Sequence, residues 1–220
     1  MSNIRTEAVK QYDYDVAVIG SGSGGIAAAV AAARNGCRVL VLEKNGYVGG
    51  MTTAGLPYLG YLDVKKRPTV GGLAIEFVER LKQDNASFGV RYCPKHCSIA
   101  AIDPDKVKIA SFLEENGVDF LLHTNAIEVE VVDGVLKSIL CECAGTRLEV
   151  RAKIFVDATG DGVISYLAGA EYEKGTAGVD LQPPSILFTI GAFLNGWKSI
   201  RRKSSPIQWN TCAPRLTLCW

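Results

Sequence analysis

The sequence has almost no net charge and no long apolar run. Its 220 residues carry 24 Lys and Arg against 23 Asp and Glu, so no global electrostatic attraction to nucleic acid or an anionic membrane is expected. The longest apolar stretch, 26–33, is far too short to span a bilayer. Residues 1–11 are polar and lack a signal-peptide pattern. We therefore expect a cytoplasmic protein with no transmembrane segment and no nucleic-acid partner.

A disulfide framework is also missing from the pattern. The seven cysteines are odd in number and irregularly spaced, which fits a reducing compartment. Cys93, His96 and Cys97 form the one local cluster of metal-ligand types, but a second cluster that would complete a tetrahedral site is absent. We expect no metal site and interpret Cys37, Cys141 and Cys143 as packing residues.

Apolar residues make up 48% of the chain, which is ordinary for an α/β protein with a buried parallel sheet. Residues 15–19 form a short apolar run that enters glycine, as a buried strand does. The alanine-rich segment 23–35 predicts a helix that ends at Gly36, and 38–42 predicts a second buried strand. Together they predict a βαβ unit.

Further elements follow along the chain. We expect a glycine-rich loop at 46–60 and an amphipathic helix at 72–82. A second helix, capped by Asp103 and Pro104, is expected at 103–117, and another strand of the main sheet at 118–123. Segment 88–101 shows no clear period.

From residue 126 the pattern becomes one of β-hairpins. Apolar and polar residues alternate over 127–132, and Asp133 and Gly134 signal a type I′ turn. The second strand of this hairpin is expected at 135–143. A third strand is expected at 146–154, and 155–158 should lead back to the main sheet, followed by a short helix within 160–170. This predicts a β-meander at about 126–154.

A glycine-rich turn follows the first strand. Gly20, Gly22 and Gly25 fit G-x-G-x-x-G, in which the first glycine permits a tight turn, the second lets the backbone approach a diphosphate, and the third lets helix and strand pack closely. The diphosphate would sit at the helix N-terminus. Glu43 ends the second strand, where a carboxylate can accept both ribose hydroxyls of an adenosine. The sequence therefore predicts dinucleotide binding.

That motif serves both NAD and FAD, and a resemblance decides between them. The run 16–25 through Glu43, the run 49–55 and the turn Ala158-Thr159-Gly160 within 154–162 resemble the FAD-binding segments of the glutathione-reductase-like flavoprotein superfamily. Within it the chain looks most like the FAD-dependent oxidoreductase family. That family is related to the fumarate reductase and succinate dehydrogenase flavoproteins and to the flavin subunit of heterodisulfide reductase. The resemblance covers 13–194.

The resemblance implies FAD as the cofactor and a set of binding residues. The diphosphate would meet the glycine-rich turn, the ribose Glu43, and the adenine Lys44 and the backbone of Ala126. The turn residues are Gly20, Gly22, Ser23, Gly24 and Gly25; those along the ribityl and flavin edge are Gly49, Gly50, Met51, Thr52, Thr53 and Ala54; those on the other side of the diphosphate are Ala158, Thr159, Gly160 and Asp161.

Some of these residues have a plainer interpretation. Thr52 and Thr53 could be ordinary loop hydroxyls, and Asp161 could be a helix N-cap. His123 ends a strand, where histidine is more often a structural donor than a functional group.

The resemblance also implies the domain organisation. We expect an α/β fold: a Rossmann-like FAD-binding domain with a central parallel sheet, a crossover β-meander and an incomplete substrate domain. After an N-terminal extension, 1–12, the FAD-binding domain spans 13–180, and 181–220 is the start of a truncated substrate domain with an irregular tail. Groups that would orient a substrate are expected in the missing part, so no catalytic residue is assigned.

The predicted function is two-electron FAD-dependent oxidoreduction, with a small-molecule substrate or a redox partner protein. Three alternatives stay open. The chain could be an inactive fragment with weak affinity for FAD or adenine nucleotides, a flavin subunit that passes electrons to an iron–sulfur partner, or an NAD-binding enzyme.

Overall fold

The computed structural model describes residues 10–53, 58–91, 99–102, 108–175, 188–191 and 215–218. The chain divides into two compact units, Met1–Tyr172 and Glu173–Trp220. Within the described part, no helix has the length and apolar character that crossing a membrane requires.

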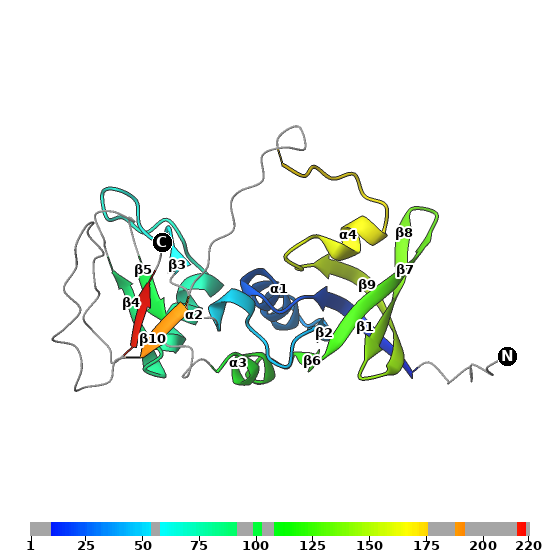
Figure 1. The fold of residues 1–220 in the computed structure, drawn as a ribbon, viewed down its shortest axis with the longest axis horizontal. Coiled ribbons are helices and arrows are strands. Elements are labelled where there is room, and N and C mark those ends of the chain that lie inside the picture. The colour runs from blue at the N-terminus through cyan, green and yellow to red at the C-terminus, as the bar shows by residue number, and fades with distance from the viewer. Residues whose placement is uncertain are drawn as a thin grey trace. The chain divides into compact units, whose positions relative to one another are not determined.

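The first unit is built around a six-stranded mixed sheet with the strand order β6-β2-β1-β9-β8-β7 (Figure 1). The first four strands in that order are parallel and the last three are joined antiparallel, so β9 belongs to both parts. The strands are β1 (Lys10–Ile19), β2 (Val39–Leu42), β6 (Asp119–Leu121), β7 (Thr124–Val132), β8 (Val135–Cys143) and β9 (Thr146–Asp157). The expected central parallel sheet with a β-meander is confirmed.

The long strand β9 connects the meander to the parallel sheet. Its first part pairs with β8 from Cys143↔Thr146 to Ser138↔Arg151. It also pairs with β1, from Lys10↔Leu148 to Ile19↔Asp157. The two segments expected at 146–154 and 155–158 are therefore one continuous strand. Between β7 and β8, Asp133 and Gly134 both have positive φ, 52° and 75°, which confirms the type I′ turn.

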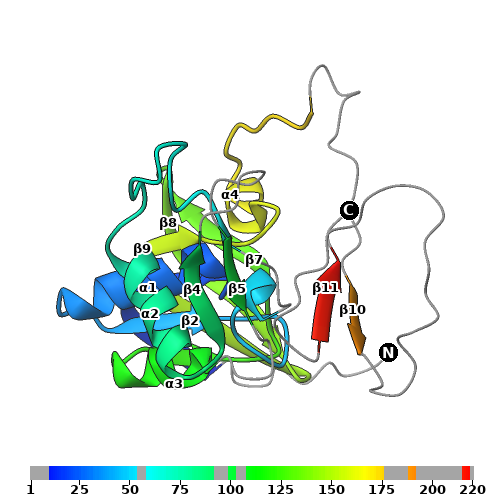
Figure 2. The same ribbon diagram turned by 90° about the vertical axis from the view of Figure 1, so that its left-hand side faces the viewer.

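Helices cover one face of the parallel sheet. Val16 and Val18 of β1 and Val39 and Val41 of β2 form a core cluster with α1 and α3, against which Phe77 of α2 also packs. These helices are α1 (Ser23–Arg34), α2 (Leu73–Gln83) and α3 (Ile109–Glu115). Figure 2 shows them next to one another. Arg34 pairs with Glu76 and Arg80 with Glu115, each at 2.6 Å, so ion pairs link α2 to both neighbours.

The meander and a short helix cover the opposite face. Ala17 and Ile19 of β1 alternate with the residues that face α1, and they pack against Ile139 and Val150 of the meander. Ile164 of α4 (Val163–Leu167) joins the same cluster. The parallel sheet is therefore a middle layer, and its carboxyl edge lies between helices and meander.

A smaller antiparallel sheet has the order β3-β5-β4, with β3 (Tyr58–Leu59), β4 (Ser87–Arg91) and β5 (Ile99–Ile102). The pairing of β4 with β5 shifts register between Ser87 and Val90, and such a shift interrupts strict alternation. A 3-10 turn, Gly50–Thr52, lies within the loop expected at 46–60.

Two other boundaries differ from expectation. β1 begins at Lys10 rather than residue 15, since its polar first half pairs with β9 and alternates between exposed Asp13 and half-buried Tyr12 and Tyr14. α3 begins at Ile109, and the expected cap at Asp103 and Pro104 lies outside the described residues.

The second unit contains an antiparallel pair, β10 (Phe188–Gly191) with β11 (Arg215–Leu218). A strand at 215–218 differs from the irregular tail expected there. Four residues are too few to show a period, and the strand's partner comes from a distant part of the sequence.

Candidate functional site

The turn between β1 and α1 requires glycine at position 20. Gly20 has a φ of +96°, a conformation that L side chains rarely adopt. A Cβ there would lie 2.6 Å from the carbonyl oxygen of Ala158 and 3.1 Å from the nitrogen of Thr159. The turn that follows β9 therefore packs directly on Gly20, and only a residue without a side chain permits it.

Gly25 permits the close approach of α1 to this turn. A Cβ at Gly25 would lie 3.0 Å from the carbonyl carbon of Gly20, 3.2 Å from the Cβ of Ala158, and closer still to the Gly20 carbonyl oxygen. Helix and strand meet here without a side chain between them, as the third glycine of the motif predicts.

Gly22 and Gly24 have a different environment. A Cβ at either position would meet no atom within 4 Å. Gly22 is the N-cap of α1 and has no side chain to satisfy the first-turn N–H groups. The helix N-terminus thus presents backbone donors to open space, the arrangement that binds phosphate.

The loop after β2 folds back onto the same turn. The Gly49 N–H donates to the Ser21 carbonyl at 2.9 Å, and the hydroxyls of Ser23 and Thr52 lie 3.0 Å apart. A Cβ at Gly50 would lie 3.0 Å from the Cα of Gly22. The runs 20–25 and 49–53, separate in sequence, therefore form one surface.

Three candidates in this second loop have distinct environments. Thr52 is fully buried, the Thr53 hydroxyl donates to the Gly50 carbonyl at 2.8 Å, and Met51 is 62% exposed. Thr53 therefore fits the loop-hydroxyl interpretation. Ala54 lies outside the described residues.

Glu43 is buried, with 5% of its surface exposed. Its Oε2 accepts hydrogen bonds from the Ser21 N–H at 2.9 Å and from the Ser21 hydroxyl, and its Oε1 from the Asn45 N–H at 2.9 Å and Nδ2 at 2.8 Å. Burial raises the pKa of this carboxyl, but these hydrogen bonds outweigh burial and hold the pKa below its ordinary value. Glu43 is thus an anion tied to the glycine-rich turn through Ser21.

The chain after Glu43 lies against the start of β7. The Thr124 N–H donates to the Glu43 carbonyl at 2.9 Å, and the His123 N–H to the Asn45 carbonyl at 3.1 Å. Lys44 is exposed, and Ala126, two residues into β7, is buried. The imidazole of His123 packs on Gly46, where a Cβ would lie 2.8 Å from the ring. This contact supports the structural interpretation of His123.

The turn after β9 is organised by Asp157, a residue absent from the sequence-based site. Its Oδ1 accepts from the Thr159 N–H at 3.1 Å and hydroxyl at 2.7 Å; its Oδ2 accepts from the Ser165 N–H at 2.8 Å and hydroxyl at 2.9 Å. The Thr159 hydroxyl in turn accepts from the Val163 N–H at 2.9 Å. Burial raises the pKa of Asp157, and the hydrogen bonds from Ser165 and Thr159 more than offset it, so the pKa is lowered.

The interpretation of Asp161 as an N-cap is wrong. The N-cap of α4 is Gly162, with a φ of 63°, and the first-turn N–H groups are satisfied by Thr159 and Asp157 instead. Gly160 and Asp161 are both exposed to solvent in this turn. The position of Asp157 just before Ala-Thr-Gly is the one sequence signal that could have found it.

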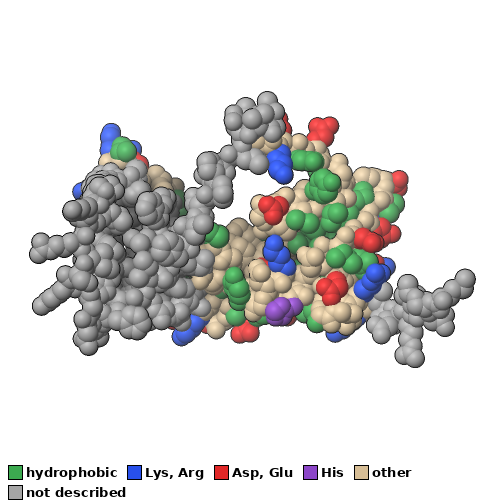
Figure 3. All heavy atoms as spheres, in the orientation of Figure 1, with side chains coloured by type: hydrophobic (Ala, Val, Ile, Leu, Met, Phe, Trp, Pro, Cys, Tyr) green, Lys and Arg blue, Asp and Glu red, His purple; other side chains and the backbone are tan. Residues whose placement is uncertain are grey.

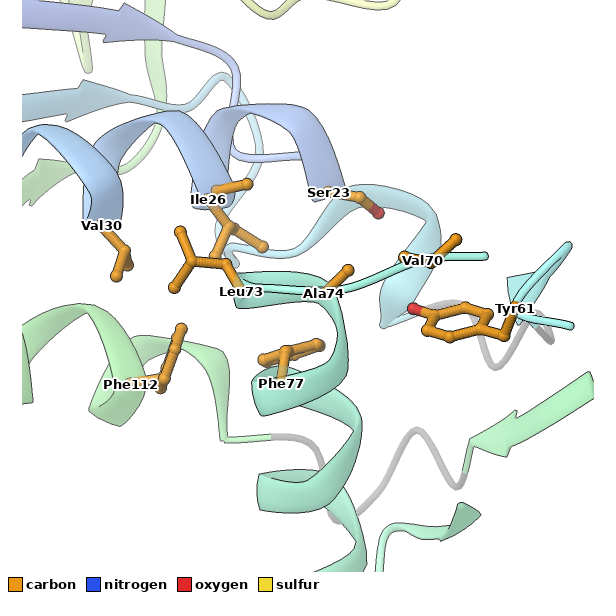
Figure 4. Close-up of a pocket in the computed structure, with 10 residues that line it drawn as sticks. Ser23, Ile26, Val30, Tyr61, Val70, Leu73, Ala74, Phe77 and Phe112 are labelled. Atoms are coloured by element: carbon orange, nitrogen blue, oxygen red, sulfur yellow. The ribbon is translucent and has the colours of Figure 1, made fainter. Parts of the chain in front are cut away.

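An apolar pocket of about 310 Å³ lies beside the glycine-rich turn, between α1 and α2 (Figure 4). Ser23 lies at one end of it, so the pocket reaches the first turn of α1. Tyr61 and Ser23 contribute its only side-chain polar atoms among the lining residues, which are Ser23, Ile26, Ala27, Val30, Tyr61, Val70, Leu73, Ala74, Phe77 and Phe112.

Apart from Ala126, which lies in β7, the described candidates thus follow the carboxyl ends of β1, β2 and β9, the edge at which open α/β sheets bind ligands. Figure 3 shows that exposed hydrophobic side chains also gather near this edge, over α4. The cluster of Cys93, His96 and Cys97 lies outside the described residues.

Two curated proteins resemble part of this chain in sequence. The chain is 26% identical over 176 residues to the digeranylgeranylglycerophospholipid reductase of Methanocaldococcus jannaschii, which covers 73% of this chain and 42% of that protein. It is 35% identical over 72 residues to the glutamate synthase [NADPH] small chain of Escherichia coli, covering 31% of this chain and 15% of that protein. The chain therefore spans less than half the length of these curated relatives.

Solved structures share the fold. The THI4 protein of Thermovibrio ammonificans matches with a TM-score of 0.50 and 21% identity, over 72% of this chain and 64% of that one. A geranylgeranyl bacteriochlorophyll reductase-like protein from Thermoplasma acidophilum matches with a TM-score of 0.50 and 20% identity, over 73% and 43% of the two chains.

The family model described as FAD dependent oxidoreductase matches residues 15–215, which includes every element of the candidate site. With the Rossmann-like sheet, the glycine-rich turn and the acidic residue in place, the chain belongs to the FAD-dependent oxidoreductase family.

Proposed function

We propose that this chain binds FAD along the carboxyl edge of its parallel sheet and takes part in two-electron oxidation and reduction of a small molecule. The observation that carries the proposal is the meeting of three segments at one turn. The Ala158–Thr159 peptide packs on Gly20, Gly50 packs on Gly22, and Glu43 is bonded to Ser21 between them.

The diphosphate end fits this geometry. Gly22 and Gly24 leave the first turn of α1 open to close approach, because a Cβ at either position would meet no atom within 4 Å. Backbone N–H groups and the positive end of the helix dipole would hold the phosphate oxygens there. Gly160, where a Cβ also meets nothing within 4 Å, offers a second open backbone in the turn that packs on Gly20.

The adenosine end requires a local exchange of hydrogen bonds. Glu43 already accepts four protein hydrogen bonds, which is close to the capacity of a carboxylate. Ribose hydroxyls would therefore replace the side-chain donor of Asn45 at Oε1, while Ser21 keeps Oε2 in place. The negative charge of Glu43 disfavours a 2′-phosphate at this position.

The flavin end would follow the loop 49–53. Ser23, which is hydrogen-bonded to the buried Thr52, and the glycines of this loop provide a small, partly polar lining next to the apolar pocket. When bound, FAD supplies the electron-transfer chemistry. The residues of this chain bind the dinucleotide and orient it. Family membership and the reductase names of its relatives support oxidoreductase activity.

Titration of the purified protein with FAD tests the proposal. We expect saturable, one-to-one binding that brings the absorption spectrum of a protein-bound flavin, with NAD failing to compete. Gly22→Val should abolish this binding while the protein stays folded, because the new side chain projects into open space that the phosphate needs.

Gly71→Val is the matched control, since a Cβ at Gly71 also meets nothing within 4 Å and Gly71 belongs neither to the glycine-rich turn nor to the loop 49–53. It should bind FAD as the unchanged protein does. Absence of FAD binding by the unchanged protein, or specific binding of NAD in its place, would refute the proposal.

A further inference from the structure

The carboxylate of Asp157 joins two elements that the cofactor site needs in one place. Through Oδ1 it holds Thr159, whose peptide nitrogen packs on Gly20, and through Oδ2 it holds Ser165 in α4. Asp157 is the last residue of β9, and its side chain lies half-buried between the turn and α4. One carboxylate thus fixes both ends of the segment 158–165.

This bonding pattern exceeds what a helix cap requires. A cap satisfies one or two first-turn N–H groups, and here the Thr159 hydroxyl accepts from Val163 while Asp157 accepts from the N–H of Ser165. The two bonds that Thr159 donates to Asp157 satisfy no N–H group of α4 themselves. They instead set the backbone conformation of the Ala158-Thr159-Gly160 turn.

The turn so held presents an open backbone next to the glycine-rich turn. Gly160 is exposed, and a Cβ there would meet no atom within 4 Å. The preceding peptide is packed against Gly20, where α1 begins. A diphosphate at the α1 N-terminus would therefore have the backbone of residue 160 on its other side only while the turn keeps this conformation.

We propose that Asp157 is a positioning residue for the diphosphate of the dinucleotide: with Thr159 and Ser165 it fixes the turn 158–160 against Gly20, and it touches no cofactor atom itself. This inference rests on the proposed FAD binding and adds a residue that none of the sequence motifs singled out. A carboxylate is needed because the N–H groups of Thr159 and Ser165 can only donate, and each donates to a different carboxylate oxygen. An amide offers one acceptor oxygen and turns an N–H towards the remaining donors.

Ligand fragments distinguish positioning from a general structural role. In Asp157→Asn, we expect the Kd for FAD and for ADP to rise by about tenfold, the loss that follows when one charged hydrogen-bond set is broken. The Kd for adenosine, which lacks phosphate, should stay unchanged, because Glu43 holds the ribose at the other end of the site. Thr159→Val should reproduce the loss and Thr159→Ser, which keeps the hydroxyl, should restore near-normal binding.

Asp15→Asn is the matched control. Asp15 is also a strand carboxylate with a lowered pKa owing to its bonds with Lys153 and Arg38, yet it lies away from the carboxyl edge of the sheet. It should leave all three affinities unchanged.

The outcomes separate this inference from the proposed function. If the unchanged protein binds neither FAD nor ADP, the proposed function itself fails. If it binds both and Asp157→Asn binds them equally well, or weakens adenosine as much as ADP, the positioning role is refuted. Should Asp157→Asn fail to fold, equal affinities of Thr159→Val and Thr159→Ser for ADP would refute it instead.

Discussion

Replacement of Gly25 by Ala tests the close contact between α1 and β1. The new methyl group would lie 3.0 Å from the carbonyl carbon of Gly20 and 3.2 Å from the Cβ of Ala158, whereas unstrained carbon contacts are about 3.5–4.0 Å. One of these neighbours is a backbone atom and the other is a Cβ, so neither can rotate away. The N-terminus of α1 must instead move out by about 0.5 Å or more.

The magnitude follows from the packing. Overpacking of this kind costs about 1–3 kcal/mol, and here the methyl also meets the Gly20 carbonyl oxygen at a distance no real side chain shows. Alanine gains about 1 kcal/mol over glycine within a helix, which offsets part of the cost. We expect Gly25→Ala to lower the free energy of unfolding by about 2 kcal/mol.

Gly24→Ala, one residue earlier, provides the comparison. Its Cβ meets nothing within 4 Å, so only the helix-propensity gain applies and stability should rise by up to about 1 kcal/mol. Urea unfolding followed by circular dichroism would measure both, with an expected gap of about 3 kcal/mol, or about 10 °C in Tm. Equal stabilities of the two variants would show that α1 does not approach the turn as closely as described.

Two further predictions concern titratable side chains. The pKa of Glu43 is lowered in the folded state, so its contribution to stability is present above the ordinary pKa of 4.5 and is lost as the pH falls through the lowered pKa. Glu43→Gln should therefore make the free energy of unfolding fall less steeply with decreasing pH. An unchanged acid dependence would contradict the hydrogen bonds from Ser21 and Asn45. Burial, with a smaller contribution from the neighbouring Cys143, raises the pKa of Cys141 to about 12. Iodoacetamide at pH 8 should therefore modify this thiol only when the protein unfolds. Mass spectrometry of the labelled peptides measures this, and labelling of Cys141 as fast as in urea would contradict its burial.

The βαβ core could be predicted from sequence because its signals are local. Short apolar runs end in glycine, and the three motif glycines each have the environment that their spacing implies. The hairpin of β7 and β8 could also be predicted, because Asp133 and Gly134 adopt the positive φ that their residue types favour.

Other features depend on contacts between distant residues, which no local pattern contains. The polar residues Lys10 to Tyr14 are a strand only because β9 pairs with them. Asp157 gains its four donors only when α4 folds back against the end of β9. Likewise the sequence predicts that Glu43 accepts ribose hydroxyls, but it contains no signal for the hydrogen bonds that Ser21 and Asn45 donate to the Glu43 carboxylate.

The shared register of β1 and β9 limits how this protein can change in length. Ile19 and Asp157, the last residues of β1 and β9, lie opposite each other, so the two strands end at the same edge position of the sheet. Loss of two residues from the middle of β9 would keep every side chain on its side but displace Thr159 by about 7 Å along the strand, away from Gly20. Loss of one residue would exchange inner and outer faces as well. Insertions should therefore accumulate in the hairpin tips at Asp133 and Gly145 and be excluded from the strand between Arg151 and Asp157.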